Sequence, residues 1–330
     1  MKIGIDIGGS HIASGIVEED GTLIGKETLD IDLSEISEAE IKSLILSSIN
    51  NEINILLQKY NYKKEDIYQI GIAAPGSPSE SSLQNLVNLH IKEFNIKDEI
   101  SKNFSCPIKL KNDGKCAGLA EKKYGSLKDY NDAVFLCLGT GVGSAVFLGG
   151  KLLEPKQSSG FEFGHMVIEK DNGETCNCGN KGCFETFASM KRFKKRAIKE
   201  FNLPFDIKSE ELQHFIRSYL KEAQKHEERI EFLNNEYLNT NENTKIEQSL
   251  QVKKFVDNYI ENVAIGISNI INIFEPEAIC FGGSFSYYDD IFLPLLEKKV
   301  EVHKFNKQTH TKFVFSKLKN DAGIIGAAEL

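Results

Sequence analysis

The stretch of residues 162–185, EFGHMVIEKDNGETCNCGNKGCFE, brings thiols, an imidazole and carboxylates together in one short segment. Three Cys thiolates and one His complete a four-coordinate Zn²⁺ site, and the glycines in the C-x-C-G-x-x-G-C spacing let the chain turn tightly around an ion. A disulfide knot is the alternative, but it would leave one thiol unpaired and would need an oxidising compartment. Glu162 and Glu185 place a carboxylate at each end of the stretch. The predicted zinc ligands are His165, Cys176, Cys178 and Cys183.

Three glycine-rich turns each follow an apolar run that is typical of a buried strand. Without a Cβ, successive backbone N–H groups can approach phosphate oxygens and form an anion-binding nest. One such turn is equally typical of a tight hairpin, whereas three turns at strand ends favour a nucleotide site. No G-K-[ST] follows and no such turn opens a first β-α unit, so neither the P-loop nor the dinucleotide fingerprint applies. The candidate nucleotide-binding residues are Gly8, Gly9, Ser10, Gly139, Thr140, Gly141, Gly282 and Gly283.

Two carboxylates stand at strand ends, where they could act on a bound nucleotide or its acceptor. Asp6 directly precedes the first glycine-rich turn and could hold the hydrated Mg²⁺ that accompanies phosphate groups; a simple turn-forming role is the alternative. Asn112 and Asp113 fall between the strand pattern IKLKN and a helical pattern. A capping role suits them, and a capping Asp can also serve as a general base, so the two interpretations are compatible.

Composition places the chain among ordinary soluble proteins. Of its 330 residues, 41% are hydrophobic and 27% charged, which is enough to bury two cores. The net charge of −8 argues against nucleic acid as the main partner, and the basic run 191–199 is interpreted as a solvated helix face. No signal-peptide core or membrane-spanning run is present, so we expect no membrane partner. The remaining cysteines, scattered as free thiols, indicate a cytoplasmic protein.

The elements that would position these residues alternate between strands and helices. Residues 2–28 read as a three-strand meander, 41–60 as an amphipathic helix and 68–74 as a strand. IDIGGSHIASGIV and CLGTGVGSAVFL share a strand, glycine turn, strand pattern, which predicts two related α/β halves facing each other across a cleft. Residues 186–250 are predicted to be mostly helical with a loop at NNEYLNTNENT, and 252–274 form a core helix that stops before Pro276.

Several of these motifs together resemble the ROK family of sugar kinases, over nearly the whole chain. DIGGS resembles the family's DIGGT, KNDGKCAGLAE its ENDANAAALGE, and LGTGVG its LGTGIG. FEFGHM and CNCGNKGCFE resemble GEIGHM and CxCGxxGCLE, the most specific pair, which is typical of the branch with glucokinases and N-acetylhexosamine kinases. The resemblance implies an α/β, two-lobed actin-like ATPase, hexokinase and Hsp70 (RNase H-like) fold with a central cleft. It also implies a homodimer.

The resemblance further implies roles for the matching positions. Asp113 would be the catalytic base that takes the proton from the attacking sugar hydroxyl. ATP and Mg²⁺ would be held by Asp6 and the glycine-rich turns, with Zn²⁺ in a structural role. We expect a small lobe of residues 1–111 plus 313–330, and a large lobe of residues 112–312 that carries the zinc loop 165–183 and the helical segment 186–274. The implied sugar-binding residues are Gly76, Asn88, Asn112, Asp113, Glu162, His165 and Glu185.

These expectations amount to an ATP-dependent hexokinase that phosphorylates the 6-hydroxyl of an aldohexose, with glucose first. Kinases for N-acetylmannosamine, N-acetylglucosamine or fructose are alternatives, because Phe161, Gly114 and Lys115 depart from the family pattern near the pocket. A non-catalytic sugar-sensing ROK protein is an alternative of another class. Such repressors carry an N-terminal helix-turn-helix, and we expect none here because the first glycine turn comes by Gly8. An ATPase or chaperone of the same fold would leave Glu162, His165 and Glu185 without a role.

Overall fold

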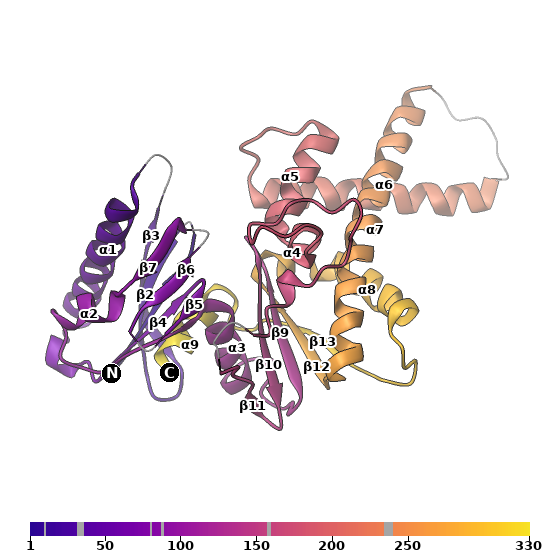
Figure 1. Ribbon diagram of the computed structural model, residues 1–330. Coiled ribbons are helices and arrows are strands. Elements are labelled where there is room, and N and C mark those ends of the chain that lie inside the picture. Colours follow the sequence, from indigo (N-terminus) through magenta and orange to yellow (C-terminus); the bar gives the residue numbers. More distant parts are fainter. Residues whose placement is uncertain (10, 32–35, 80, 87–88, 157–159, 234–239) are drawn as a thin grey trace.

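Two lobes, each built on a mixed five-stranded sheet, make up the protein (Figure 1). The computed structural model describes residues 1–9, 11–31, 36–79, 81–86, 89–156, 160–233 and 240–330. The first lobe contains the elements up to residue 112 together with the C-terminal helix, which returns to it from the far end of the chain (Figure 1). Within the described ranges, no helix is long and apolar enough to cross a membrane.

The sheet of the first lobe has the order β3-β2-β1-β4-β8. Its first three strands form the predicted meander, with antiparallel pairing between β1 and β2 and between β2 and β3, and β4 and β8 then join in parallel. The apolar residues of β1 are fully buried because helix α1 (Glu38–Lys59) covers the sheet with its isoleucine face. The strands are β1 (Lys2–Ile7), β2 (His11–Val17), β3 (Leu23–Asp30), β4 (Gln69–Ala74) and β8 (Ile108–Asn112).

The sheet of the second lobe, β11-β10-β9-β12-β13, repeats this plan. β9 pairs antiparallel with β10 and parallel with β12, as β1 does with β2 and β4. The predicted internal repeat is therefore confirmed, because the two similar sequence patterns form β1–β2 and β9–β10. The strands are β9 (Ala133–Leu138), β10 (Val142–Leu148), β11 (Lys151–Leu152), β12 (Ala278–Gly282) and β13 (Lys312–Phe315).

The two sheets are connected through a pair of helices, α3 (Asp113–Lys123) and α9 (Ala322–Ala328), which lie between them (Figure 1). Helix α9 packs on β1 and β4, α3 packs on β9 and β10, and the two helices pack on each other. Glycines permit this close approach: a Cβ at Gly71 would lie 1.7 Å from the Ala327 carbonyl oxygen, and one at Gly326 would lie 1.7 Å from that of Cys116.

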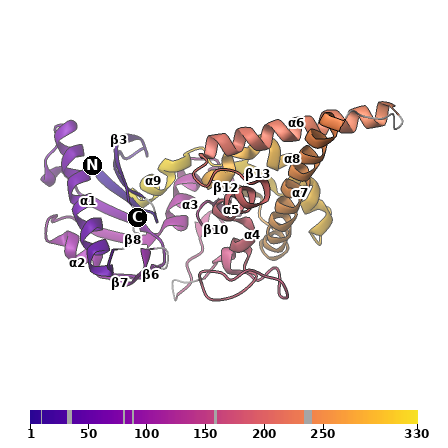
Figure 2. The same cartoon turned by 90° about the horizontal axis from the view of Figure 1, so that it is seen from above.

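Helices cover the outer face of the second sheet. The amphipathic α7 packs its apolar face with α4, α6 and α8 into one large core, and Figure 2 shows α6 reaching outward from this lobe, away from the first. The helices are α4 (Phe184–Ala188), α5 (Met190–Phe201), α6 (Ser209–Leu233), α7 (Thr240–Phe274) and α8 (Asp289–His303). The first lobe also has β5 (Ser77–Pro78), β6 (Leu83–Leu86), β7 (Ile91–Phe94) and α2 (Ile96–Ser101).

Two predicted boundaries differ from the structure. Residues 313–330 were assigned to the small lobe, but β13 pairs with β12 in the second sheet, because its alternating apolar residues complete that core. The predicted loop at residues 234–244 lies partly outside the described residues, and its last part, 240–244, is helical.

Candidate active site

Asn112 and Asp113 stand where β8 ends and α3 begins, in the space between the two sheets. The Asn112 Oδ1 caps the helix by accepting from the Lys115 N–H at 3.2 Å, and its Nδ2 donates to the Gly76 carbonyl oxygen at 3.2 Å. Asp113 Oδ1 accepts from the Gly114 N–H at 2.8 Å. The predicted capping role is confirmed for Asn112, and these hydrogen bonds fix the backbone at the start of α3.

Asp6 and Asp113 lie close enough for their charges to interact. Burial, together with the Asp113 charge, raises the pKa of Asp6 to about 7, and only Lys26 opposes this shift. Burial also raises the pKa of Asp113, although the Gly114 N–H lowers it. The two carboxyls therefore lie near each other at the ends of β1 and β8, two strands of the same sheet. Oxygen ligands of this kind suit Mg²⁺, which would supply charge neutralisation on phosphate groups.

The four predicted zinc ligands converge, with their ligand atoms all within 4.8 Å of one another. The Sγ atoms of Cys178 and Cys183 are 3.7 Å apart, and Cys176 Sγ is 3.7 Å from His165 Nδ1. Tetrahedral Zn²⁺ with ordinary bond lengths requires about 3.8 Å between two sulfurs and about 3.6 Å between sulfur and nitrogen. The residues fit the ion, and all four positions would be filled by protein.

The loop geometry explains the glycines of this motif. Gly179 and Gly182 have φ of +93° and +73°, values that side chains rarely adopt. A Cβ at Gly182 would also lie 1.6 Å from the Glu169 carbonyl oxygen. The loop is tied further by Arg192 and Arg196 on α5, which both donate to the Glu174 carboxylate. Both arginines stay partly exposed, as the prediction of a solvated basic face requires, and in addition they bind the zinc loop.

The three predicted sugar ligands from the zinc stretch lie around the same point. Glu162 precedes the 3-10 turn Phe163–His165, and its charge interacts with His165, Asp113 and Glu185. Burial raises the pKa of Glu162, whereas the Lys115 ammonium lowers it. Lys115 is buried in the first turn of α3, and burial lowers the pKa of its ammonium, whereas the Glu162 charge raises it. Sequence reasoning noted Lys115 only as a departure from the family pattern.

Two of the glycine-rich turns lie against each other, and the third belongs to the other sheet. A Cβ at Gly283, where φ is +71°, would lie 2.6 Å from the Leu138 carbonyl oxygen and 3.0 Å from the Gly139 nitrogen. The turn at Gly139 closes through its N–H and the Gly141 carbonyl oxygen, 3.0 Å apart, and Thr140 is exposed at its tip. Gly8, Gly9 and Gly282 end their strands as predicted. The candidate residues Ser10 and Asn88 lie outside the described residues.

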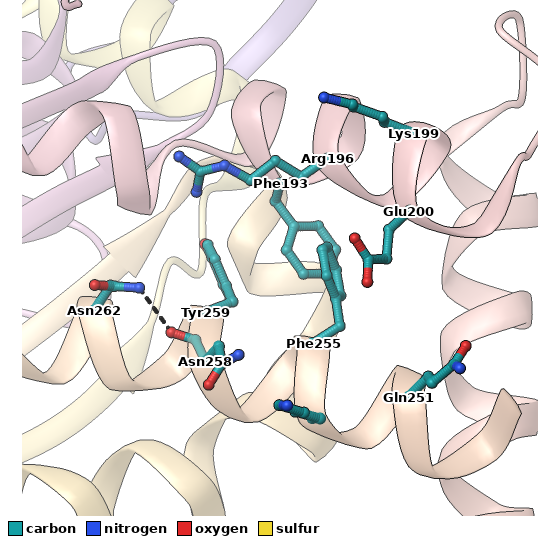
Figure 3. A pocket seen from close by; sticks show the side chains of 10 residues that line it. Phe193, Arg196, Lys199, Glu200, Gln251, Phe255, Asn258, Tyr259 and Asn262 are labelled. Carbon is teal, nitrogen blue, oxygen red and sulfur yellow. Dashed lines mark hydrogen bonds between the residues drawn. The ribbon is translucent and has the colours of Figure 1, made fainter. Parts of the chain in front are cut away.

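A separate groove of about 560 Å³ opens between α5 and α7 (Figure 3). The rings of Phe193 and Phe255, with centroids 5.1 Å apart, form its apolar floor, and Lys199 and Glu200 stand at its edge. None of the predicted site residues lines it. The candidate chemistry is therefore confined to the region between the sheets and the zinc loop.

Comparisons with known proteins bear on the whole chain. A glucokinase from Thermotoga maritima is 29% identical over 338 residues, covering 99% of this chain and 96% of the relative. A xylose repressor from Caldicellulosiruptor bescii is 25% identical over 330 residues, covering 98% of this chain and 76% of the repressor.

Solved structures share the fold. A ROK family glucokinase from Streptomyces griseus, solved with glucose and AMPPNP, superposes with a TM-score of 0.76 at 21% identity, covering 99% of this chain and 98% of that one. The ROK hexokinase from Thermus thermophilus gives 0.70 at 21% identity, with 99% and 96% covered. The predicted actin-like ATPase and hexokinase fold is confirmed. The model of the ROK family matches residues 2–330, and the chain belongs to that family.

Proposed function

We propose that this chain is an ATP-dependent hexose kinase that transfers the γ-phosphoryl group to the 6-hydroxyl of an aldohexose, with glucose as the preferred substrate. The observation that carries this proposal is that Asp6, Asp113 and Glu162 are partly buried near one another, close enough for the Asp113 charge to raise the pKa of the other two carboxyls. Glucokinases among the relatives, and the bound glucose and AMPPNP of the Streptomyces griseus structure, support the substrate and donor. A sugar sensor would need no carboxylate pair of this kind.

In this mechanism Asp113 orients the sugar hydroxyl and accepts its proton as the oxygen attacks the γ-phosphorus. Phosphoryl transfer depends mainly on positioning and charge neutralisation, so one carboxylate base is sufficient. Burial favours the reaction because it raises the pKa of Asp113 and makes the carboxylate a stronger base. Asn112 donates to the Gly76 carbonyl oxygen and is held in place by this hydrogen bond. It would thereby fix the start of α3 and the direction of the Asp113 side chain.

The remaining residues would bind the two substrates. Glu162, His165 and Glu185 would accept or donate hydrogen bonds to sugar hydroxyls, and the zinc would fix His165 through Nδ1, leaving Nε2 for a hydroxyl. Mg²⁺ held near Asp6 would neutralise phosphate charge. The backbone N–H groups of the turns at Gly8, Gly139 and Gly282 would bind phosphate oxygens.

The test is ADP release measured with and without sugar. Glucose, mannose, fructose, N-acetylglucosamine and N-acetylmannosamine are compared at equal concentration, with Asp113→Asn as the matched inactive variant. We expect turnover that depends on sugar and is highest with glucose. Equal ADP release without sugar would indicate an ATPase instead, and sugar binding without turnover would indicate a sensor. A highest rate on an N-acetylated sugar would move the assignment to the N-acetylhexosamine kinases.

The homodimer stays a prediction of the family resemblance, and the cytoplasmic location stays a prediction from the scattered cysteines. Sedimentation of the pure protein gives its mass in solution and tests the first directly.

A further inference from the structure

The two carboxylate oxygens of Glu185, at the start of α4, contact different segments of the chain. Oε2 accepts the backbone N–H of Val142 at 3.0 Å, at the first residue of β10, directly after the turn that follows β9. Oε1 lies 3.8 Å from Cys176 Sγ and therefore stays beside the zinc ligands. One side chain thus joins the predicted sugar-binding loop to the turn predicted to bind phosphate.

The turn itself is closely fitted to this carboxylate. A Cβ added at Gly141 would lie 2.5 Å from Glu185 Oε2 and 3.3 Å from its Cδ, whereas a Cβ at Gly139 would meet nothing within 4 Å. The carbonyl oxygen of Gly139 accepts the Lys191 N–H at 3.2 Å, at the start of α5. The turn is therefore held twice by the segment that directly follows the zinc loop.

We propose that Glu185 couples the two substrate sites, so that sugar and nucleotide bind with positive cooperativity through this carboxylate. The inference rests on the proposed function. A hydroxyl that donates to Oε1 fixes the side chain, and a fixed Oε2 holds the Val142 N–H and keeps the turn ordered for phosphate. Because coupling is reciprocal, nucleotide bound at the turn strengthens sugar binding by the same factor. In this role Glu185 contacts the sugar through Oε1 and positions the turn through Oε2.

Two alanine variants in the same turn test this coupling. In Gly141→Ala the new Cβ clashes with the end of the Glu185 side chain and not with backbone, so the fold is retained and the carboxylate moves. Neither Gly141 nor Gly139 has a positive φ, so alanine fits the backbone at both. Glucose binding is measured by calorimetry without nucleotide. We expect Gly141→Ala to weaken glucose binding at least 10-fold, and Gly139→Ala to change it less than 2-fold.

The coupling itself is measured as the ratio of glucose Kd values without and with AMPPNP and Mg²⁺. We expect a ratio of about 5 or more for the wild type, within the usual range of coupled sites, and a ratio near 1 for Glu185→Gln, whose amide cannot serve both neighbours. Equal glucose affinity in the Gly141→Ala and Gly139→Ala variants, or an unchanged ratio in Glu185→Gln, overturns the coupling. If the wild-type protein binds none of the five sugars, the proposed function is overturned. This result comes from the wild type alone, so it is distinguishable from a failure of the coupling.

Discussion

Replacing Asp6 by Asn should stabilise the protein at neutral and alkaline pH, although it removes a predicted Mg²⁺ ligand. Burial and the Asp113 charge raise the pKa of Asp6 from 3.8 to about 7. A carboxyl whose pKa is higher in the folded than in the unfolded chain favours folding when it is protonated. Its contribution is complete below about pH 4, and it is lost as the pH rises through about 7. At pH 8 Asp6 is therefore ionised in the folded protein, and this charge lowers the free energy of unfolding.

The size of the effect follows from the shift. A change from 3.8 to about 7 corresponds to about 4 kcal/mol at most. Since the side chain is partly accessible to water, screening reduces this, and we expect about 2 kcal/mol. Asn has nearly the same shape and no charge at any pH. Asp6→Asn should thus raise the free energy of unfolding by about 2 kcal/mol at pH 8 and leave it nearly unchanged at pH 4.

Urea unfolding of the free protein at pH 4, 6 and 8, without Mg²⁺ or nucleotide, measures this difference. Asp206→Asn is the control, because Asp206 is exposed in the segment between α5 and α6. We also expect Asp6→Asn to lose kinase activity. A variant that is more stable but inactive would show that Asp6 lowers the stability of the protein in exchange for function. An equal change at pH 4 and pH 8, or a loss of stability at pH 8, would refute the reasoning.

Three further substitutions test other parts of the site. Asp113→Asn should lower turnover by about 10² to 10⁴-fold while the sugar Kd changes less than 3-fold, and an equal loss in both would exclude the base role. Cys178→Ser, or chelation of the metal, should raise the sugar KM and lower the Tm, because His165 is no longer fixed; an unchanged KM would separate zinc from the pocket. Gly326→Ala puts a Cβ 1.7 Å from the Cys116 carbonyl oxygen and should cost about 1–3 kcal/mol of stability, with Gly139→Ala as the tolerated control.

The features that the sequence predicted well are local ones. The predicted zinc ligands could be found because their spacing within residues 165–183 already brings them together, and the distance between the sulfurs of Cys178 and Cys183 fits a tetrahedral ion. The repeated strand, turn, strand pattern predicted both sheets, since each unit folds from consecutive residues. The capping of α3 by Asn112 follows from the residue type at the helix start.

What could not be predicted depends on contacts between distant segments. The Glu185 to Val142 hydrogen bond spans 43 positions, and no spacing rule links the two residues. The arginines of α5 looked like part of a solvated basic run, because Glu174, which binds them, lies in a loop with no periodic pattern. The raised pKa of Asp6 likewise depends on burial, which becomes known only when the two sheets and α9 are placed.

Phe161 departs from the family motif, and its backbone conformation shows how the chain accommodates this residue. Where the resembled family motif has Gly, Phe161 adopts φ of +64°, a conformation that costs an aromatic residue about 1–3 kcal/mol. Its carbonyl accepts the Ser144 hydroxyl, and its ring packs edge-on against Phe274, 6.1 Å away. These contacts hold the strained conformation directly before Glu162. Gly adopts a positive φ without strain, so we infer that in this chain the contacts of Phe161 compensate for the strain and fix the backbone directly before Glu162.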